Sequence, residues 1–198
     1  MIVGKQIYLR AVEEGDLPFL QALANDPYIS NSVVGWGYPV SLRSQESWFE
    51  RSLLDQYNKR FLICAKKTDE PLGLTGYWDI DQHNRTAVSG IKLDAKFSGK
   101  GYGVDSIMTS MAWAFYVAGL RRLAAPILDF NHASYALYVK KCGWRVEGIE
   151  KEATFKKGRW CDMYRVAILR SEFSSNPLSA EYIERVCPVD VNNIVKHT

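Results

Sequence analysis

Alternating apolar and polar positions mark the first element of the chain. Residues 7, 9 and 11 are apolar and alternate with Tyr8 and Arg10, the period-two pattern of a strand with one buried face. We therefore expect a strand over Gln6–Val12. Further strands are expected at Arg60–Lys66, Leu72–Asp81, Thr86–Asp94, Arg122–Asp129, Arg145–Phe155 and Trp160–Leu169. Polar turns join three pairs of them, at Thr68–Pro71, Gln82–Arg85 and Lys156–Arg159.

Helical spacing is clearest in the middle of the chain. The apolar positions there are Val104, Ile107, Met108, Met111, Phe115 and Ala118. An earlier helix is expected after Asp16 as its cap, with Pro18 in the first turn. Its apolar face would carry Phe19, Leu20 and Leu23.

Two more helices follow from capping residues. Ser41 or Ser44 would begin one of them, which carries Trp48, Phe49 and Leu53. The other would run from His132 to Cys142, with Asn131 as its cap and Gly143 at the left-handed position after its end. The aromatic segment Tyr28–Pro39 is expected to be irregular.

The resulting order is β-α-α-β-β-β-α-β-α-β-β, which predicts an α+β domain around one mixed, mostly antiparallel sheet flanked by helices. We expect this domain to span residues 1–173 and a weakly patterned tail to span 174–198, with a short helix at Ser179–Val186. Apolar Tyr182, Ile183 and Val186 in that tail, together with an exposed edge strand, suggest a homodimer paired through the tail.

Composition narrows the class of protein. The 198 residues are 47% hydrophobic, enough for one domain with a real core. A net charge of +3 without basic runs argues against nucleic acid as a partner, and four widely separated cysteines without C-x-x-C spacing argue against a metal site. The chain shows neither a signal peptide nor an apolar run of membrane-spanning length, so we expect a cytoplasmic protein without a membrane partner.

The segment Ser98–Gly103 carries the clearest chemistry. Three alternating glycines leave backbone N–H groups bare at the start of a helix, where the dipole favours negative charge, as in sites for phosphate or pyrophosphate. The spacing differs from the dinucleotide fingerprint G-x-G-x-x-G, and no G-x-x-x-x-G-K-[ST] follows. The alternative is a glycine-rich turn that only connects a strand to a helix.

Three segments in this order resemble the GNAT superfamily of acyl-CoA N-acyltransferases, over roughly Gln6–Phe173. The opening Ile7–Leu17 is similar to the branch that includes spermidine and ribosomal-protein N-terminal acetyltransferases. Ser98–Gly103 is similar to the pyrophosphate loop of the superfamily, and Asn131–Gly148 to its N-x-x-A-x-x-x-Y-x-x-x-G-F-x-x-E-G segment. The resemblance implies acetyl-CoA as co-substrate and direct attack by a primary amine of a small molecule, such as an amino sugar or amine metabolite, or by a peptide α-amine.

The resemblance also implies roles for single residues. Tyr138 would protonate the departing thiolate; the alternative is a half-buried aromatic residue of a helix. Expected contacts to the cofactor are Ile91, Lys92, Leu93, Ser98, Gly99, Lys100, Gly101, Tyr102, Gly103 and Asn131. The resemblance also implies a β-bulge that splays the strand before the glycine loop at about Gly90–Leu93, and Gly90 suits such a bulge. Asn131 is equally explained as a helix cap, and Lys100 as a solvated side chain.

Two positions depart from the superfamily pattern. Ser98 stands where Gln or Arg is usual, and Val88 stands where several relatives carry a glutamate. The general base is therefore unassigned, and His83, Asp79 and Asp81 are candidates. These departures also keep open a non-catalytic module that senses acyl-CoA.

Candidate substrate contacts are Trp36, Tyr38, Trp78 and Asp79. Ordinary aromatic packing explains the three aromatic residues equally well. The segment Tyr28–Pro39 has no Asp or Glu, which favours an acceptor other than a polyamine.

Overall fold

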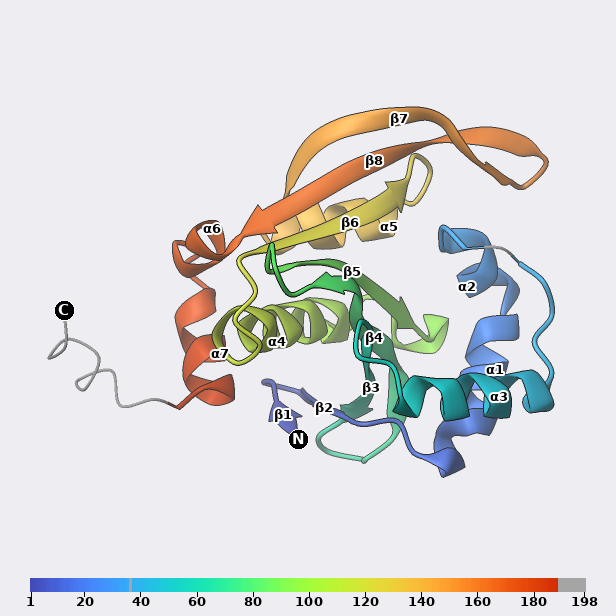
Figure 1. The fold of residues 1–198 in the computed structure, drawn as a ribbon, viewed down its shortest axis with the longest axis horizontal. Coiled ribbons are helices and arrows are strands. Elements are labelled where there is room, and N and C mark those ends of the chain that lie inside the picture. Colours follow the sequence, from blue (N-terminus) through green and yellow to red (C-terminus); the bar gives the residue numbers. More distant parts are fainter. Residues whose placement is uncertain (36, 189–198) are drawn as a thin grey trace, which may run out of the picture.

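The computed structural model describes residues 1–35 and 37–188. Within these residues eight strands form one sheet, in the spatial order β1-β2-β3-β4-β5-β6-β8-β7 (Figure 1). The strands are β1 (Ile2–Val3), β2 (Ile7–Arg10), β3 (Lys59–Ala65), β4 (Pro71–Asp81), β5 (Thr86–Leu93), β6 (Arg122–Leu128), β7 (Arg145–Lys156) and β8 (Arg159–Leu169). All neighbours are antiparallel except β5 and β6. The predicted mixed, mostly antiparallel sheet is confirmed.

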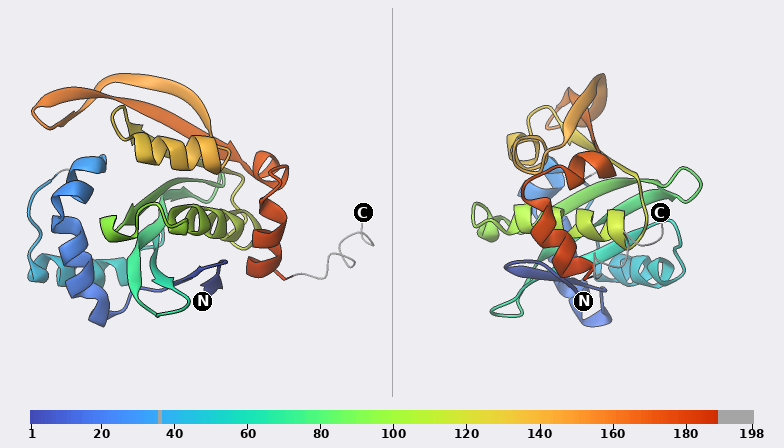
Figure 2. Two further views of the ribbon diagram at one scale, coloured as in Figure 1. Left: turned by 180° about the vertical axis from the view of Figure 1, so that it is seen from behind. Right: turned by 90° about the vertical axis from the view of Figure 1, so that its left-hand side faces the viewer.

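The helical elements surround this sheet. They are η1 (Glu14–Asp16), α1 (Leu17–Asn25), α2 (Pro27–Ser32), α3 (Leu42–Leu53), η2 (Ala95–Phe97), α4 (Tyr102–Tyr116), α5 (His132–Tyr135), the π-helical turn η3 (Ala136–Lys141), α6 (Arg170–Ser174) and α7 (Ser179–Val186). Seen from behind, α4 and α5 lie in front of the sheet, whereas α3 lies on the opposite side, which faces the viewer of Figure 1 (Figure 2). The sheet is therefore the middle layer of three.

Each face of the sheet has its own core. The α4 side holds the larger one, in which Tyr77, Met111 and Phe115 are fully buried. On the other side Leu62, Cys64 and Leu74 of the sheet pack against apolar residues of α1 and α2. Alternate residues of the central strands supply the two cores, because successive side chains of a strand point to opposite faces.

The parallel pair opens the sheet. Thr86, Ala87 and Val88 of β5 pair with residues 122–124 of β6, and no pairing continues beyond Val88. On its other edge β5 stays in regular register with β4, through Gly90 opposite Gly76. The expected bulge at Gly90 is therefore wrong. A glycine is needed there because a Cβ would lie 2.8 Å from the ring of Trp78.

A buried carboxylate attaches the N-terminal segment to α4. Asp105 accepts hydrogen bonds from the backbone N–H groups of Lys5, Gln6 and Ile7, at 2.9, 2.6 and 3.0 Å. Hydrogen bonds to a charged acceptor are about twice as strong as neutral ones, so this contact fixes β2 against the helix that carries the glycine loop.

Two local predictions need correction. Tyr28–Pro39 is not irregular throughout, because Asp26 caps α2 by accepting from the N–H groups of Tyr28 and Ile29. Asp16 does precede α1, but its side chain makes no capping bond. Its carboxylate instead forms a bidentate ion pair with Arg10, at 2.7 and 2.8 Å.

The C-terminal helix α7 packs within its own chain. It lies against α4 and β1. Tyr182 is buried, and Ile183 and Val186 pack on the larger core. Tyr182 is therefore not available to a second copy, whereas Ile183 and Val186 keep part of their surface, and the homodimer stays a prediction. Residues 189–198 of the tail lie outside the described residues.

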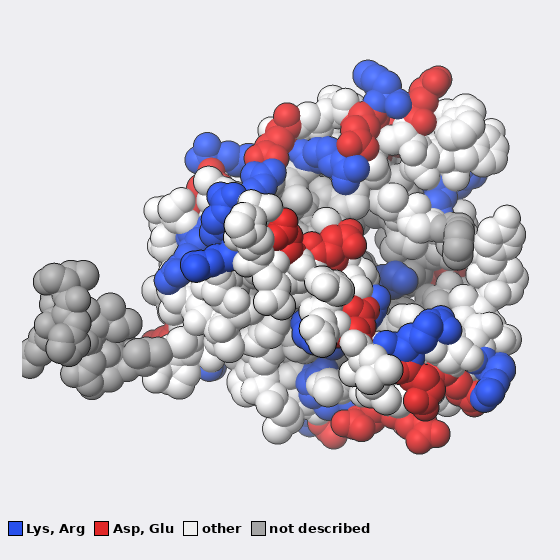
Figure 3. Space-filling model, in the orientation of Figure 1, with Lys and Arg blue, Asp and Glu red and all other residues white. Residues whose placement is uncertain are grey.

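One face of the molecule shows mixed charge. Lys, Arg, Asp and Glu intermingle on the face drawn in Figure 3, without a large region of one sign. None of the helices among the described residues combines the length and the apolar character needed to cross a bilayer. In the same residues no three His, Cys, Asp or Glu side chains are grouped to hold a metal ion.

Candidate active site

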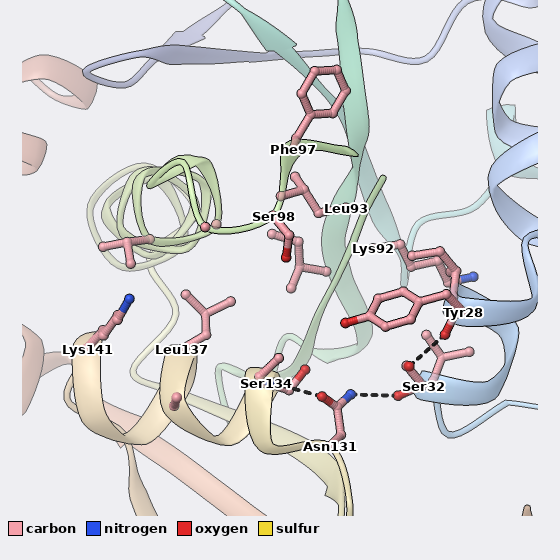
Figure 4. A pocket seen from close by; sticks show the side chains of 18 of the residues that line it. Tyr28, Ser32, Lys92, Leu93, Phe97, Ser98, Asn131, Ser134, Leu137 and Lys141 are labelled. Atoms are coloured by element: carbon pink, nitrogen blue, oxygen red, sulfur yellow. Dashed lines mark hydrogen bonds between the residues drawn. The ribbon is translucent and has the colours of Figure 1, made fainter. Parts of the chain in front are cut away.

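One cavity lies where the sheet opens. Its volume is about 320 Å³, and its walls come from α2, the end of β5, the glycine loop, α4, α5 and η3 (Figure 4). The lining residues are Tyr28, Ile29, Ser32, Val33, Ile91, Lys92, Leu93, Phe97, Ser98, Gly99, Gly101, Gly103, Val104, Asn131, Ala133, Ser134, Ala136, Leu137 and Lys141. The cavity therefore brings together the glycine loop, the end of β5 and Asn131, which are far apart in the sequence.

The glycine loop presents bare donors to this cavity. Gly99 and Gly101 have φ angles of 76° and 87°, a conformation that residues with a side chain rarely adopt. Within the described residues the N–H groups of Gly99, Lys100 and Gly101 have no backbone acceptor. The first turn of α4 adds N–H groups that have no partner inside the helix. This set of donors fits a pyrophosphate, as the sequence predicts.

Only some of the loop residues that were expected to contact the cofactor line the cavity. Ser98, Gly99, Gly101 and Gly103 line the cavity, and Lys100 and Tyr102 do not. The Lys100 ammonium instead lies over the ring of Phe97, 5.5 Å from its centroid. Lys141 of η3 supplies a cation to the cavity wall, and Figure 4 shows it pointing toward α4.

The open edge of β5 offers backbone groups. The N–H of Asp94 donates to Leu72 on the β4 side, and the carbonyl of Arg85 accepts from Arg121 on the β6 side. Because backbone groups of successive residues point to opposite edges of a strand, Ile91 and Leu93 direct theirs to the open edge. Lys92 directs its own toward β4, so it reaches the cavity only with its side chain.

Asn131 connects two walls of the cavity. Its Oδ1 accepts from the N–H of Ser134 at 3.0 Å, so it caps α5. Its Nδ2 donates to the carbonyl of Ser32 at 2.8 Å, across to α2 (Figure 4). The residue therefore caps one helix and also sets the distance between α2 and α5.

Tyr138 lies behind the wall rather than on it. It belongs to η3, is 3% exposed, and packs edge-on against Trp144 with ring centroids 4.8 Å apart. Its hydroxyl has no hydrogen-bond partner among the described residues, and neither has that of Ser89. Burial raises the pKa of Tyr138, and the Ser89 hydroxyl opposes this shift. Ser89 directly follows Val88, so the phenol reaches the place where β5 and β6 part.

The expected substrate contacts lie elsewhere. Trp36 is outside the described residues. Tyr38 is 74% exposed, and neither it nor Trp78 or Asp79 lines the cavity. Trp78 is half-buried over Gly90, on the face of β4 and β5 that also carries Lys92. Asp79 is exposed and has a left-handed backbone, with φ of 51°, where the pairing of β4 with β5 is irregular between Trp78 and Asp81.

None of the candidate bases, His83, Asp79 and Asp81, lines the cavity. His83 is exposed in the turn between β4 and β5. The Asp81 carboxylate accepts from the backbone and side-chain nitrogens of Asn84, at 2.8 and 2.6 Å, and so stabilises that turn. Among the described lining residues there is no Asp, Glu or His.

Sequence reasoning missed the α2 wall and the side chain of Lys141, whereas Lys92 was expected in the site as a cofactor contact. A signal for α2 was present, because Asp26 followed by Pro27 is a good helix start. Lys141 carries no such signal, because the direction of its side chain depends on the π-helical turn η3.

Comparisons with known proteins agree with this geometry. The model of the acetyltransferase (GNAT) domain matches residues 6–145. The spermidine N(1)-acetyltransferase of Vibrio cholerae is 27% identical over 171 residues, which are 86% of this chain and 97% of that protein. An uncharacterised N-acetyltransferase, p20 of Bacillus licheniformis, is 26% identical over 172 residues, which are 86% and 96% of the two chains.

A solved structure shows the same fold. Spermidine N-acetyltransferase from Vibrio cholerae, in complex with CoA and spermine, superposes with a TM-score of 0.81 and 27% identity, over 85% of this chain and 98% of that one. The family model covers well over half of the sequence. The chain therefore belongs to the GNAT family of acetyltransferases, as its three motifs predict.

Proposed function

We propose that this protein transfers an acetyl group from acetyl-CoA to a primary amine of a small molecule or to a peptide α-amine. The observation that carries the proposal is that bare N–H groups at the start of α4 and the open edge of β5 adjoin one another in the same cavity. One half of such a cavity suits a pyrophosphate, and the other half admits an extended chain that pairs with a strand.

The donor half of the cavity would hold CoA through backbone groups. The N–H groups of residues 99–104 would bind the pyrophosphate, with Lys141 as the nearby cation. The backbone of Ile91 and Leu93 would pair with the amide groups of the pantetheine arm along the open edge. Ser98 in place of the usual Gln or Arg should lower the affinity for CoA only slightly, because the backbone rather than this side chain provides the hydrogen-bond donors.

The proton balance of the reaction assigns one role to a side chain. The attacking nitrogen forms the new C–N bond and then loses a proton, the thioester C–S bond breaks, and the thiolate takes a proton. Tyr138 would donate the proton to the thiolate, since burial raises its pKa and keeps the phenol protonated at neutral pH. The proton that the nitrogen loses after the attack restores, through solvent, the acid that protonates the thiolate. With no carboxylate or imidazole among the described lining residues, the ammonium of the acceptor would lose its proton to solvent.

The residues that line the cavity favour some classes of acceptor amine over others. The relative from Vibrio cholerae is named for spermidine, a polycation. The lining residues of this cavity include two lysines and no carboxylate. An amino sugar, an amine metabolite or a peptide α-amine fits such a wall better than a polyamine does.

Thiol release from acetyl-CoA over a panel of amines tests the proposal. The panel contains amino sugars, amino acids, peptides and spermidine, and Gly101→Val serves as the variant with a disrupted loop. Turnover of at least one amine, lost in Gly101→Val, is expected. Acetyl-CoA binding without turnover of any amine would instead identify a sensor, the function that Val88 in place of a glutamate favours.

A further inference from the structure

Lys92 is a cation without a partner in the wall of the cavity. Its side chain is half-buried and lines the cavity. Among the described residues its ammonium has no hydrogen-bond acceptor and no carboxylate partner, whereas Lys156, also in this region, donates to the carbonyl of Ser30 at 3.0 Å. Burial lowers the pKa of Lys92, and the second cause is the charge of Arg60. A buried charge is costly unless another group compensates it.

The sheet around Lys92 is positively charged. Lys92 pairs with Leu74 across β4 and β5, and in the next row of this face Arg60 pairs with Gly76, which in turn pairs with Gly90. The two glycines leave space over the sheet. Arg60 uses it and lies between the rings of Trp48 and Trp78, at 5.3 and 6.0 Å from their centroids.

One carboxylate partly balances these two cations. Asp55 pairs with Arg60 at 3.6 Å. Burial lowers the pKa of Arg60, and the charge of Asp55 opposes that shift. Lys92 has no such neighbour, so one positive charge on this face stays uncompensated.

The Lys92 side chain points away from the glycine loop. Figure 4 shows it extending toward Tyr28 of α2, while Ser98 lies on the α4 side of the cavity. The space-filling view is hollowed between α2 and the sheet, and atoms of Lys or Arg are visible within the hollow (Figure 3). The cation therefore faces the half of the cavity that the pyrophosphate does not occupy.

We propose that Lys92 binds an anionic group of the acceptor, so that the substrate is an amine that also carries a carboxylate or a phosphate. This inference rests on the proposed acetyl transfer. An anion beside Lys92 would supply the missing compensation, with a charge-assisted hydrogen bond. A polyamine would bring more positive charge to Lys92 and Arg60 and is disfavoured for that reason.

Matched acceptors and matched variants test the proposal. Each acceptor is offered in two forms, an amino acid against its carboxamide and an amino sugar phosphate against the free amino sugar. Lys92→Met removes the charge but keeps most of the side chain, Lys92→Arg keeps the charge, and Lys67→Met removes a charge from an exposed turn remote from the cavity. Acetyl-CoA affinity is measured by calorimetry for every variant.

The wild type should prefer one anionic form, and the preferred pair identifies carboxylate or phosphate. Lys92→Met should lower kcat/KM for that form by about 10- to 100-fold, the range for a lost hydrogen bond to a charged group. Its effect on the neutral form and on acetyl-CoA affinity should be small. Lys92→Arg should retain much of the preference, and Lys67→Met should retain all of it.

Three results would overturn the inference. A wild type that favours neutral amines or spermidine would contradict it while leaving acetyl transfer intact. Equal losses for both members of a pair in Lys92→Met, with a shifted pH profile of kcat, would make Lys92 a proton acceptor instead. A weaker acetyl-CoA affinity with unchanged acceptor preference would place Lys92 in the cofactor site. Absence of turnover with every amine would instead refute the proposed function.

Discussion

Two substitutions of Asn131 can measure separately the contributions of its two hydrogen bonds, to Ser134 and to Ser32. Asn131→Ala removes both the cap of α5 and the hydrogen bond to Ser32. Asn131→Asp keeps an acceptor for the N–H of Ser134 but has no donor for the Ser32 carbonyl, and it directs a carboxylate oxygen at that carbonyl. The pair of variants therefore compares loss of the link between α2 and α5 with loss of the link and the cap together.

The expected losses follow from the two bonds. An N-cap replaced by alanine costs about 1 kcal/mol, and a neutral hydrogen bond is worth about 1 kcal/mol. Asn131→Ala should therefore lower the free energy of unfolding by about 2 kcal/mol. Asn131→Asp should lose about 1 kcal/mol, because it keeps the cap, while the gain of about 0.3–1 kcal/mol from a carboxylate at a helix start is offset by repulsion from the Ser32 carbonyl.

Urea unfolding measures both values, and kinetics tests the role of the link. Without the 2.8 Å hydrogen bond from Asn131 Nδ2 to the Ser32 carbonyl, α2 is held less firmly against α5, so the KM of the acceptor should rise in both variants. The Kd of acetyl-CoA should change little. Equal stability losses in Ala and Asp would refute the division into two contacts. A raised acetyl-CoA Kd with an unchanged acceptor KM would make Asn131 a cofactor contact.

Three further predictions concern the loop, the acid and an ion pair. Gly101→Val should raise the Kd of acetyl-CoA in calorimetry, because φ of 87° is strained for valine; an unchanged Kd would remove the loop from the site. Tyr138→Phe should lower kcat by about 10²–10⁴-fold at unchanged acetyl-CoA affinity, and a near wild-type kcat with rate-limiting chemistry would show a structural role. The pKa of Asp16 is lowered: burial opposes the shift, but the hydrogen bonds from Arg10 and Glu13 prevail. Stability should thus decline as pH falls below the unfolded value of about 4, and Asp16→Asn should flatten this decline in urea titrations at several pH values.

The elements that the sequence predicts well are those with long periodic patterns or strong turn chemistry. The predicted β7–β8 turn has Lys157 and Gly158 at φ of 52° and 77°, the left-handed pair that a two-residue hairpin needs. Ser41 caps α3 as expected, by accepting from the N–H of Ser44. In each case the information lies within a few neighbouring residues.

The missed features depend on short elements or distant contacts. The six residues of α2 are too few to show helical periodicity, and the two residues of β1 too few to show alternation. The bond from Asn131 to Ser32 joins residues 99 positions apart. The Asp16–Arg10 pair could not be separated from a cap, because an aspartate before a helix suits both roles.

The alternation of β5 explains how one strand serves both halves of the cavity. Ser89 and Ile91 face the α4 side, where Tyr138 and the glycine loop lie, while Gly90 and Lys92 face the side of Arg60 and Trp78. The strand pairs with β6 only as far as Val88. A register shift of one residue would move Lys92 to the side of the glycine loop, where acetyl-CoA is proposed to bind, and Ile91 to the side proposed for the acceptor amine. The specificity proposed for Lys92 is therefore set by the pairing of Gly90 with Gly76 as much as by the lysine itself.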